Sequence, residues 1–578
     1  MGATSYALSK ILYYLEHTGL PSAPHLDALQ KALAKLVDRG NKNGFTYVRK
    51  ELLPGPAKQG GFGMLDVGQH VTARHAVWAV KLVTGDEEVP WVHMGRALLR
   101  HLWGAGWHAM LPLLCAAQHP ANASHSEPGV RMPGPLARIF LALHQLPALQ
   151  DVAAHAAPLQ PGPWCATAPI VGNPWLVDQE GQVLGRDSCS EILLQMSHSY
   201  TVGGLTEFTR DAQAASELEW RRGRWALFPL MAARQRMLPL LRFVPGEWLA
   251  IASAAPCPPH PPGPAFHDAV RLLLNRLGWR VSEVGSDVPI VIPLSSLSVR
   301  MAYRMLMQPT IDLRVQRWRQ FIADATSTDV TLVDDAMVKS LQGVLGSIWR
   351  RVKWSNSRKC LYWQLVVGGI PTSARHNTGA SCYCTAVGHD CPDRTHHFWH
   401  CPAAAAVTAE ICKCLGVPQL HRKQLWLMEL PDEMRGATGQ ANAPPSGSAR
   451  GALKEVWMVV CLAALQAMWV TAKKVMGPNI RAMLAAQPRG LHAVVVDSAV
   501  AAFWELLHDF AQSSTIPGSW RRLLPPGTPF LHFPHVNRRI QVNTTTLPVH
   551  VHEHVPDVLV PAHVPVLVHV PVPVSDTA

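Results

Sequence analysis

The feature that most constrains this chain is a dense group of cysteine and histidine residues late in the sequence. Six of the 12 cysteines lie between Cys382 and Cys414, and several histidines lie among them. A disulfide-stapled secreted domain is short and carries cysteine throughout, whereas the other cysteines of this 578-residue chain are scattered. Local clustering beside histidine predicts a metal site in a protein that keeps its cysteines reduced.

The predicted ligands form two short pairs that are 11 residues apart. Cys382 and Cys384 make a C-x-C pair, and alternate side chains of an extended chain face the same way. His396 and Cys401 make an H-x-x-x-x-C pair that is followed directly by Pro402. Zinc prefers four nitrogen or sulfur ligands in a tetrahedron, and two local pairs supply them. We therefore expect Cys382, Cys384, His396 and Cys401 to bind one Zn²⁺.

Two further residues are alternative ligands in this segment. Cys391 lies between the two pairs, and His397 lies four residues before the last cysteine of the set, one helical turn away. The other interpretation needs no metal, with reduced cysteines and hydrogen-bonded histidines around an alanine-rich helix that begins at Pro402. Cys412 and Cys414 fall within that helix, and we expect them to be packing residues.

The segment around this group is strongly basic. The chain carries 52 Lys and Arg residues against 40 Asp and Glu residues, a net charge of +12. Between residues 345 and 425, ten basic residues stand against three acidic ones, so this stretch holds a surplus of seven positive charges. The balance favours an anionic partner, and nucleic acid is the first candidate.

Six of these basic residues are the predicted nucleic-acid contacts: Arg350, Arg351, Lys353, Arg358, Lys359 and Arg375. Four aromatic residues interleave with the first five: Trp349, Trp354, Tyr362 and Trp363. Cations for phosphates beside aromatic faces for bases are typical of proteins that bind RNA or single-stranded DNA. The alternative is a solvated helix face with tryptophans in the core, because Trp349 directly follows Ile348, which is in the core-facing stripe of a predicted helix.

The rest of the sequence predicts a mainly α-helical protein divided by proline- and glycine-rich stretches. The first predicted segments are helices over 1–115 with a glycine-rich break, a poorly defined and partly helical region over 116–253, a proline-rich linker over 254–264 and a helical lead-in over 265–381. A zinc-binding knuckle over 382–415 follows, then apolar helices over 416–535 with a flexible loop at 436–451, and a disordered tail rich in Val, Pro and His over 540–578.

Two helices are predicted in more detail. One amphipathic helix is indicated by apolar residues at helical spacing: Met337, Leu341, Leu345, Ile348 and Val352. The other contains the longest apolar run, 456–472, which is at the lower limit for a membrane span and is interpreted as a buried core helix. The first residues, MGATSYALSK, lack a signal-peptide pattern. We therefore expect an intracellular protein, nuclear or cytoplasmic, that is neither secreted nor membrane-bound.

The residues that lead into the cysteine–histidine group complete a longer motif. Between Arg351 and Arg375 the sequence carries Trp354, Trp363 and then Ile370-Pro371-Thr372. This part of the chain resembles the zinc-binding domain that follows the reverse transcriptase in non-LTR, LINE-type retrotransposon polyproteins. The shared pattern is a tryptophan-bearing helical lead-in followed, in this order, by G-(I/L)-P-T, C-x-C and H-x-x-x-x-C-P. The resemblance implies a zinc-binding domain of the reverse-transcriptase-associated type.

An earlier stretch is similar to another part of the same polyproteins. Gly60-Gly61-Phe62-Gly63 is followed by a helical pattern that contains Trp78. In that family a GG-(L/F)-G turn precedes a tryptophan-bearing helix just after the polymerase palm. The resemblance implies that residues 1–115 correspond to the thumb-like segment of such a polymerase.

Two catalytic parts of these polyproteins are not found in the sequence. A polymerase palm holds Mg²⁺ with paired carboxylates in an aromatic-x-Asp-Asp motif. The adjacent aspartates of this chain, Asp334 and Asp335, lack the aromatic residue and precede the amphipathic helix, where acidic residues are common at helix starts. No endonuclease constellation follows the cysteine–histidine group.

The sequence therefore predicts a non-catalytic nucleic-acid-binding protein, a retroelement-derived fragment with Zn²⁺ as its cofactor. Two alternatives stay open. In one, the chain is a portion of an active reverse transcriptase whose catalytic palm lies upstream. In the other, it is an inert structural or protein-interaction scaffold in which the tryptophans are core residues.

Overall fold

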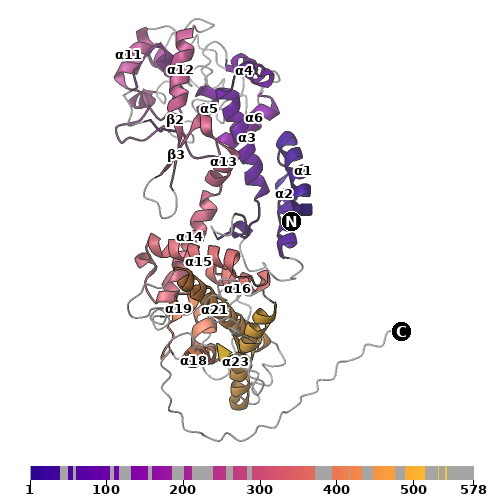
Figure 1. The fold of residues 1–578 in the computed structure, drawn as a ribbon. Coiled ribbons are helices and arrows are strands. Elements are labelled where there is room, and N and C mark those ends of the chain that lie inside the picture. Colours follow the sequence, from indigo (N-terminus) through magenta and orange to yellow (C-terminus); the bar gives the residue numbers. More distant parts are fainter. Residues whose placement is uncertain are drawn as a thin grey trace, which may run out of the picture.

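The structure is a computed structural model of the chain. It describes residues 2–38, 50–55, 60–103, 110–115, 132–153, 159–184, 201–210, 238–254, 264–282, 289–370, 393–415, 417–431, 447–475, 488–513, 531–532 and 541–542. Within these ranges the protein is mainly helical, which confirms the predicted fold class at that level. Figure 1 shows an elongated molecule with a group of helices at each end, joined by α13 (Val299–Leu306) and α14 (Gln308–Thr326).

Three helices form a small packing unit beside the upper group. α1 (Gly2–Thr18) and α2 (Ala23–Asp38) lie against α3 (Val67–Thr84), and their leucines share a small core with two valines of α3. The carboxylate of Glu16 on α1 accepts a hydrogen bond of 2.7 Å from the indole N–H of Trp78 on α3. The helices predicted at the start of the chain are therefore confirmed in the described part of 1–115.

The upper group in Figure 1 packs helices and a small antiparallel sheet around one core. Strand order is β1–β2–β3, and Trp279 of β2 lies opposite Ile292 of β3. The sequence did not predict this sheet. The elements of the group are α3, α4 (Pro90–Trp103), α5 (Met110–Cys115), α6 (Gly134–Leu143), β1 (Gln150–Asp151), η5 (Pro163–Thr167), α8 (Val202–Arg210), η7 (Leu238–Phe243), α11 (Gly246–Ala254), α12 (Pro264–Arg276), β2 (Leu277–Val281), β3 (Ile290–Pro293), η8 (Leu294–Ser296) and α13.

The lower group has a second core, and the predicted lead-in, knuckle and apolar helices all contribute to it in their described parts. Its elements are η1 (Lys50–Leu52), α14, η9 (Val330–Leu332), α15 (Asp335–Arg351), α16 (Asn356–Val366), the π-helical turn η11 (His396–His400), α18 (Pro402–Leu415), α19 (Arg422–Trp426), α21 (Gly447–Val475) and α23 (Pro488–Ser513). A two-stranded pair follows, β4 (Leu531–His532) with β5 (Gln541–Val542). The predicted tail after residue 542 lies outside the described residues.

The glycine-rich break joins the early part of the chain to the lower core. Gly60 has a φ of +73°, and a Cβ on it would lie 2.1 Å from the ring of Trp318, so this position requires glycine. A Cβ on Gly61 would lie 2.3 Å from the carbonyl oxygen of Gly55. The carbonyl of Gly60 accepts a hydrogen bond of 2.7 Å from the buried indole of Trp363 on α16. The break is therefore a packed joint between sequence-distant segments.

The predicted amphipathic helix is α15, and its first residues confirm the interpretation of the aspartate pair. Asp334 is the N-cap, and its Oδ1 accepts a hydrogen bond of 2.7 Å from the N–H of Met337. Asp335 forms an ion pair with Arg319 of α14. The buried stripe agrees with the prediction except at its start, where Val338 is buried and Met337 is 40 % exposed.

The predicted buried helix is α21, which begins at Gly447, inside the stretch predicted to be a loop. Among the described helices, α21 is the one long and apolar enough to cross a membrane by length and composition. In the structure 78 % of that window, Leu453–Ala472, is buried inside the protein. It packs against α16, α18 and α23, so it serves as the central helix of the lower core.

Candidate metal centre and basic cluster

The second ligand pair folds as a single π-helical turn. The N–H of Cys401 donates a hydrogen bond of 2.8 Å to the carbonyl of His396, five residues earlier. This i→i+5 closure brings residues four and five apart onto one side of the turn, so both His396 and His397 lie near Cys401. α18 then begins at Pro402, as predicted. We call residues His396–Cys401 the histidine–cysteine turn.

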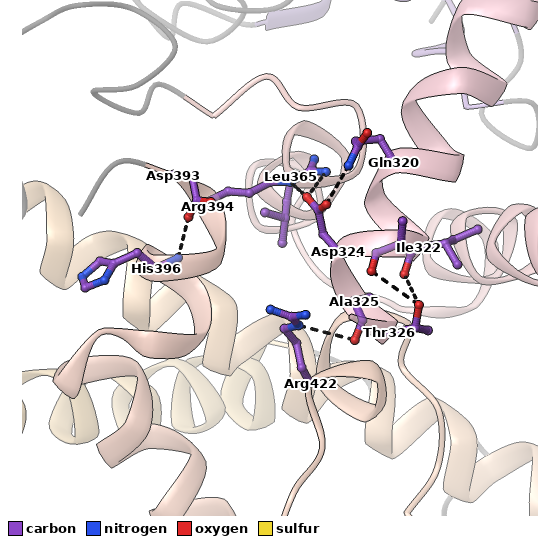
Figure 2. Close-up of polar contacts among 11 residues, drawn as sticks. Gln320, Ile322, Asp324, Ala325, Thr326, Leu365, Asp393, Arg394, His396 and Arg422 are labelled. Carbon is purple, nitrogen blue, oxygen red and sulfur yellow. Dashed lines mark hydrogen bonds and ion pairs between the residues drawn. The ribbon is translucent and has the colours of Figure 1, made fainter. Parts of the chain in front are cut away.

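An ion pair and a cap fix the entry to this turn (Figure 2). The guanidinium of Arg394 donates to the Asp324 carboxylate of α14 through Nε (2.9 Å) and Nη2 (2.6 Å). Its third donor, Nη1, reaches the carbonyl of Leu365 at the end of α16 (3.0 Å). The carboxylate of Asp393 accepts a hydrogen bond of 2.9 Å from the N–H of His396. The turn is therefore held against α14 and α16 from its first residue.

A second arginine ties the following segment to the same helix. Arg422, the first residue of α19, donates to the carbonyl of Ala325 (3.4 Å) and to the hydroxyl of Ser327 (2.5 Å), at the C-terminus of α14. A cation is favourable at this negative end of a helix. Its guanidinium also lies 5.6 Å from the ring centroid of Trp426, which is fully buried. Figure 2 shows Arg394 and Arg422 approaching α14 from two different segments.

The three donor side chains in the turn are all buried: His396 is 7 %, His397 3 % and Cys401 4 % exposed. The two imidazole rings are 5.8 Å apart, nearly perpendicular to one another. Burial, together with the neighbouring His396, lowers the pKa of His397. A lowered pKa favours the neutral imidazole, which is the form that binds metal ions.

His397 also carries a buried polar atom without a partner. Its Nδ1 is buried and has no hydrogen-bond partner among the described residues. A buried polar atom left unpaired costs roughly 1–3 kcal/mol, and coordination of a metal ion would remove that cost. The soft thiol of Cys401 and an imidazole nitrogen are the donor types that zinc prefers. This half of the predicted ligand set therefore has donor types that suit zinc, and His397 is a second histidine in the turn beside the predicted His396.

The other half of the set cannot be placed. Cys382, Cys384 and Cys391 lie outside the described residues, as does Arg375. In the described part of the chain no group of three or more His, Cys, Asp and Glu residues is arranged to hold a metal ion. The described turn supplies one pair of donors, and the C-x-C pair remains a prediction from the sequence.

The predicted nucleic-acid contacts, apart from Arg375, lie around the junction of α15 and α16: Arg350, Arg351, Lys353, Arg358 and Lys359. We call these five residues the basic cluster. The Arg351 side chain is 57 % exposed, with Nη1 3.6 Å from Glu455, and Arg358 is 31 % exposed, with Nη2 3.9 Å from Asp509. Glu455 is 13 % exposed and Asp509 53 % exposed, so the longer Arg358 pair has the more exposed carboxylate, and exposed pairs of this kind contribute about 0–1 kcal/mol.

Lys359 differs from the other four members, because it is only 6 % exposed. Its Nζ lies 5.7 Å from the ring centroid of Trp349. Burial lowers the pKa of Lys359, and the nearby charge of Lys353 lowers it further. A count of charges in the sequence could not reveal this difference in depth.

The aromatic residues of the basic cluster are explained by packing. Trp354, Tyr362 and Trp363 are buried, and Trp349 is partly buried against Phe62. The hydroxyl of Tyr362 donates 2.8 Å to the carbonyl of Trp426, so its polar end is satisfied inside the core. The core alternative of the sequence analysis is the one that agrees with the structure. These rings offer no exposed pair of faces between which bases could stack.

Comparisons of this chain with protein-family models, curated proteins and solved structures give no match. The resemblance to the LINE-type zinc-binding domain therefore depends on the sequence motifs alone.

Two residues that hold the site escaped the sequence analysis. In the sequence Asp324 is an ordinary acidic residue of a predicted helix, and Arg394 is one of the basic residues near the cysteines. They are 70 residues apart in sequence, and no local pattern links them. The spacing of Arg394 two residues before His396 was the only available sign that it belongs to the turn.

Proposed function

We propose that this chain is a non-catalytic nucleic-acid-binding protein that carries one structural Zn²⁺ in a domain of the reverse-transcriptase-associated type. The observation that carries the proposal is the buried, unpartnered Nδ1 of His397 in the same turn as the buried thiol of Cys401. Cys401 lies close enough to His397 to affect its pKa, and the Nδ1 of His397 has no partner among the described residues.

The ligands in this proposal are Cys382, Cys384 and Cys401 with one of the two histidines, His396 or His397. Cys391 is the alternative sulfur. Bound zinc would supply a cross-link between the C-x-C segment and the turn, and it would supply no redox chemistry. The turn is already part of the lower core through Phe398 and Cys401, so the metal fixes the C-x-C segment rather than the whole domain.

α16 connects the proposed metal centre to the basic cluster. Its C-terminal end contacts Arg394 through the carbonyl of Leu365, and its first residues include Arg358 and Lys359. An 11-residue helix is about 16 Å long, so the two features lie at opposite ends of one rigid element. A strand of nucleic acid on the basic cluster would therefore lie about 16 Å from the end of α16 that contacts Arg394.

Contact with phosphates, rather than base stacking, is the binding mode that the side chains support, because the aromatic residues of this region are packed in the core. Five phosphate contacts to a single strand predict a slope of about −3.5 when log K is plotted against log[salt]. Fluorescence anisotropy of a labelled single-stranded oligonucleotide between 50 and 300 mM salt measures this slope. A flat response would contradict the proposed binding mode.

The metal is tested by measuring zinc in the purified chain by native and inductively coupled plasma mass spectrometry. We expect one zinc per chain in the wild type and a substoichiometric amount in Cys401→Ala. Cys412→Ala is the matched control, because Cys412 lies farther along α18 and packs against the edge of the core. We expect this variant to retain its zinc. Equal zinc content in both variants would contradict the ligand assignment.

A scaffold without nucleic-acid binding is the alternative that one observation favours, namely the packing of the aromatic residues in the core. It predicts the same fold and no salt-dependent affinity for oligonucleotides. The zinc measurement and the salt titration together separate it from our proposal.

A further inference from the structure

The outer face of α1 carries the most exposed aromatic side chains in the described part of the chain. Tyr13 is 61 % exposed and Tyr14 is 65 % exposed. The aromatic residues beside the basic cluster are buried or partly buried, so they offer little ring surface to a base. Rings that a base can reach are found instead on α1, which lies along one side of the molecule (Figure 1).

A histidine on the same face holds these rings in place. The Nδ1 of His17, which is also exposed, donates a hydrogen bond of 2.9 Å to the carbonyl of Tyr13, one turn earlier. The imidazole centroid lies 4.6 Å from that of the Tyr13 ring. The rings of Tyr13 and Tyr14 are 5.9 Å apart and nearly perpendicular. We call Tyr13, Tyr14 and His17 the aromatic platform. Rings that support one another lose little conformational freedom when a flat ligand stacks on them.

The charges of α1 favour an anionic ligand at the aromatic platform. Lys10 is exposed and lies three residues before Tyr13, on the same face of the helix. Glu16 is the one acid in the sequence of residues 2–18. Its carboxylate faces α3, where it accepts hydrogen bonds from Arg74 and from the indole of Trp78, so its charge is compensated. The exposed charge beside the platform is therefore positive, which complements the phosphates of a nucleic acid.

The aromatic platform and the basic cluster belong to one packed body. α1 and α2 share a small core with α3, and Leu33 of α2 packs against both that core and the lower core. The basic cluster borders the lower core through Trp349 and Trp354. One strand can therefore place phosphates on the basic cluster and bases on the platform.

We propose that the aromatic platform binds bases of a single-stranded nucleic acid by stacking, with Lys10 beside a neighbouring phosphate. Every base has a flat π-face, so stacking on tyrosine tolerates any sequence. Ring faces and positive charge, the two features that such a partner needs, occur together on this face of α1. The inference rests on the proposed function, because a bound strand supplies the bases, and it adds the base contacts that the basic cluster does not provide.

The first experiment compares a base-bearing oligonucleotide with an abasic one of equal length, by fluorescence anisotropy with the full-length chain. The wild type should bind the base-bearing strand about tenfold more tightly. The double variant Tyr13→Leu/Tyr14→Leu should lose this preference and keep its salt slope, because no phosphate contact is removed. Tyr13→Phe/Tyr14→Phe is the matched control, because it keeps both rings and should retain the preference. Salt-dependent binding with no preference in the wild type, or with the same preference in the leucine variant, overturns the platform and leaves the proposed function standing.

The second experiment needs no strand. Saturation-transfer NMR with adenosine monophosphate should show transfer to the base protons from the wild type and the phenylalanine variant, and none from the leucine variant. Transfer to the base without binding of any strand would keep the platform and contradict the proposed function. No transfer from the wild type overturns the platform as a base site and leaves a protein partner as the occupant of this face.

Discussion

The two ends of α16 hold charge in opposite ways. At the C-terminal end, Arg394 and Asp324 are 14 % and 25 % exposed, and their closest atoms are 2.6 Å apart. At the N-terminal end, Arg351 is 57 % exposed and lies 3.6 Å from Glu455. One end is a desolvated, hydrogen-bonded pair, whereas at the other end Arg351 and Arg358 are more exposed and lie farther from their carboxylates.

The difference indicates which charges hold the fold and which are available to a ligand. A desolvated pair has lost its water, so removing one partner leaves the other without compensation. A solvated pair gains little from its partner, because water and salt screen the attraction. Charges of the first kind position the histidine–cysteine turn, and charges of the second kind can exchange a carboxylate for a phosphate.

The largest expected effect is the loss of the buried pair. Arg394→Met leaves Asp324 with only the amide of Gln320 as a described side-chain partner, and we expect the free energy of unfolding to fall by about 2–3 kcal/mol. Urea denaturation followed by circular dichroism measures the change. The double variant with Asp324→Asn should lose less than the sum of the two single variants. A loss of less than about 0.5 kcal/mol in the free energy of unfolding would show that the Arg394–Asp324 pair contributes no more than an exposed pair.

A smaller effect is expected from acid. Burial lowers the pKa of His397 from its ordinary value of 6.5 despite the nearby Asp393. Below about pH 6.5 His397 is therefore protonated more readily in the unfolded chain than in the native protein. The free energy of unfolding falls as the pH falls. The same direction applies to His70 of α3, whose pKa is lowered by burial and by Arg74.

The measurement is the urea midpoint of chelator-treated protein at pH 7.5, 6.5 and 5.5. His397→Gln should flatten the decline, and His70→Gln should flatten a separate part of it, because His397 lies in the histidine–cysteine turn and His70 lies on α3. A decline that is unchanged in His397→Gln would mean that the turn does not resist protonation. The C-terminal end of α16 would then be no more resistant to protonation than the exposed N-terminal end.

The parts of the fold that the sequence predicted are those governed by local rules. Asp334 caps α15 because an acid before an amphipathic stripe satisfies the first N–H groups. α11 ends at Ala254 and α12 begins at Pro264, and the proline-rich residues between them lie outside the described residues. The proline after H-x-x-x-x-C marked the start of a helix, and α18 begins at Pro402.

The parts that could not be predicted depend on contacts between distant segments. The sheet that pairs β1 with β2 joins Asp151 to Leu277, and neither short strand has a period of its own. The burial of Lys359 depends on packing against Trp349 of the preceding helix. The sequence alone does not show this contact, so it does not distinguish Lys359 from Lys353. Depth, rather than residue type, separates the structural from the available charges.

The smallest expected effect is at the exposed end. Arg351→Met removes a 3.6 Å pair with Glu455 from a side chain that is 57 % exposed, and we expect a loss of about 0.3 kcal/mol at 0.1 M salt. A double-mutant cycle with Glu455→Gln should give a coupling energy below about 0.5 kcal/mol that disappears in 1 M NaCl. A coupling above about 1 kcal/mol that survives high salt would mean that this pair is as fixed as Arg394 with Asp324. A phosphate would then have to displace a structural carboxylate, and Arg351 could not belong to the nucleic-acid contacts.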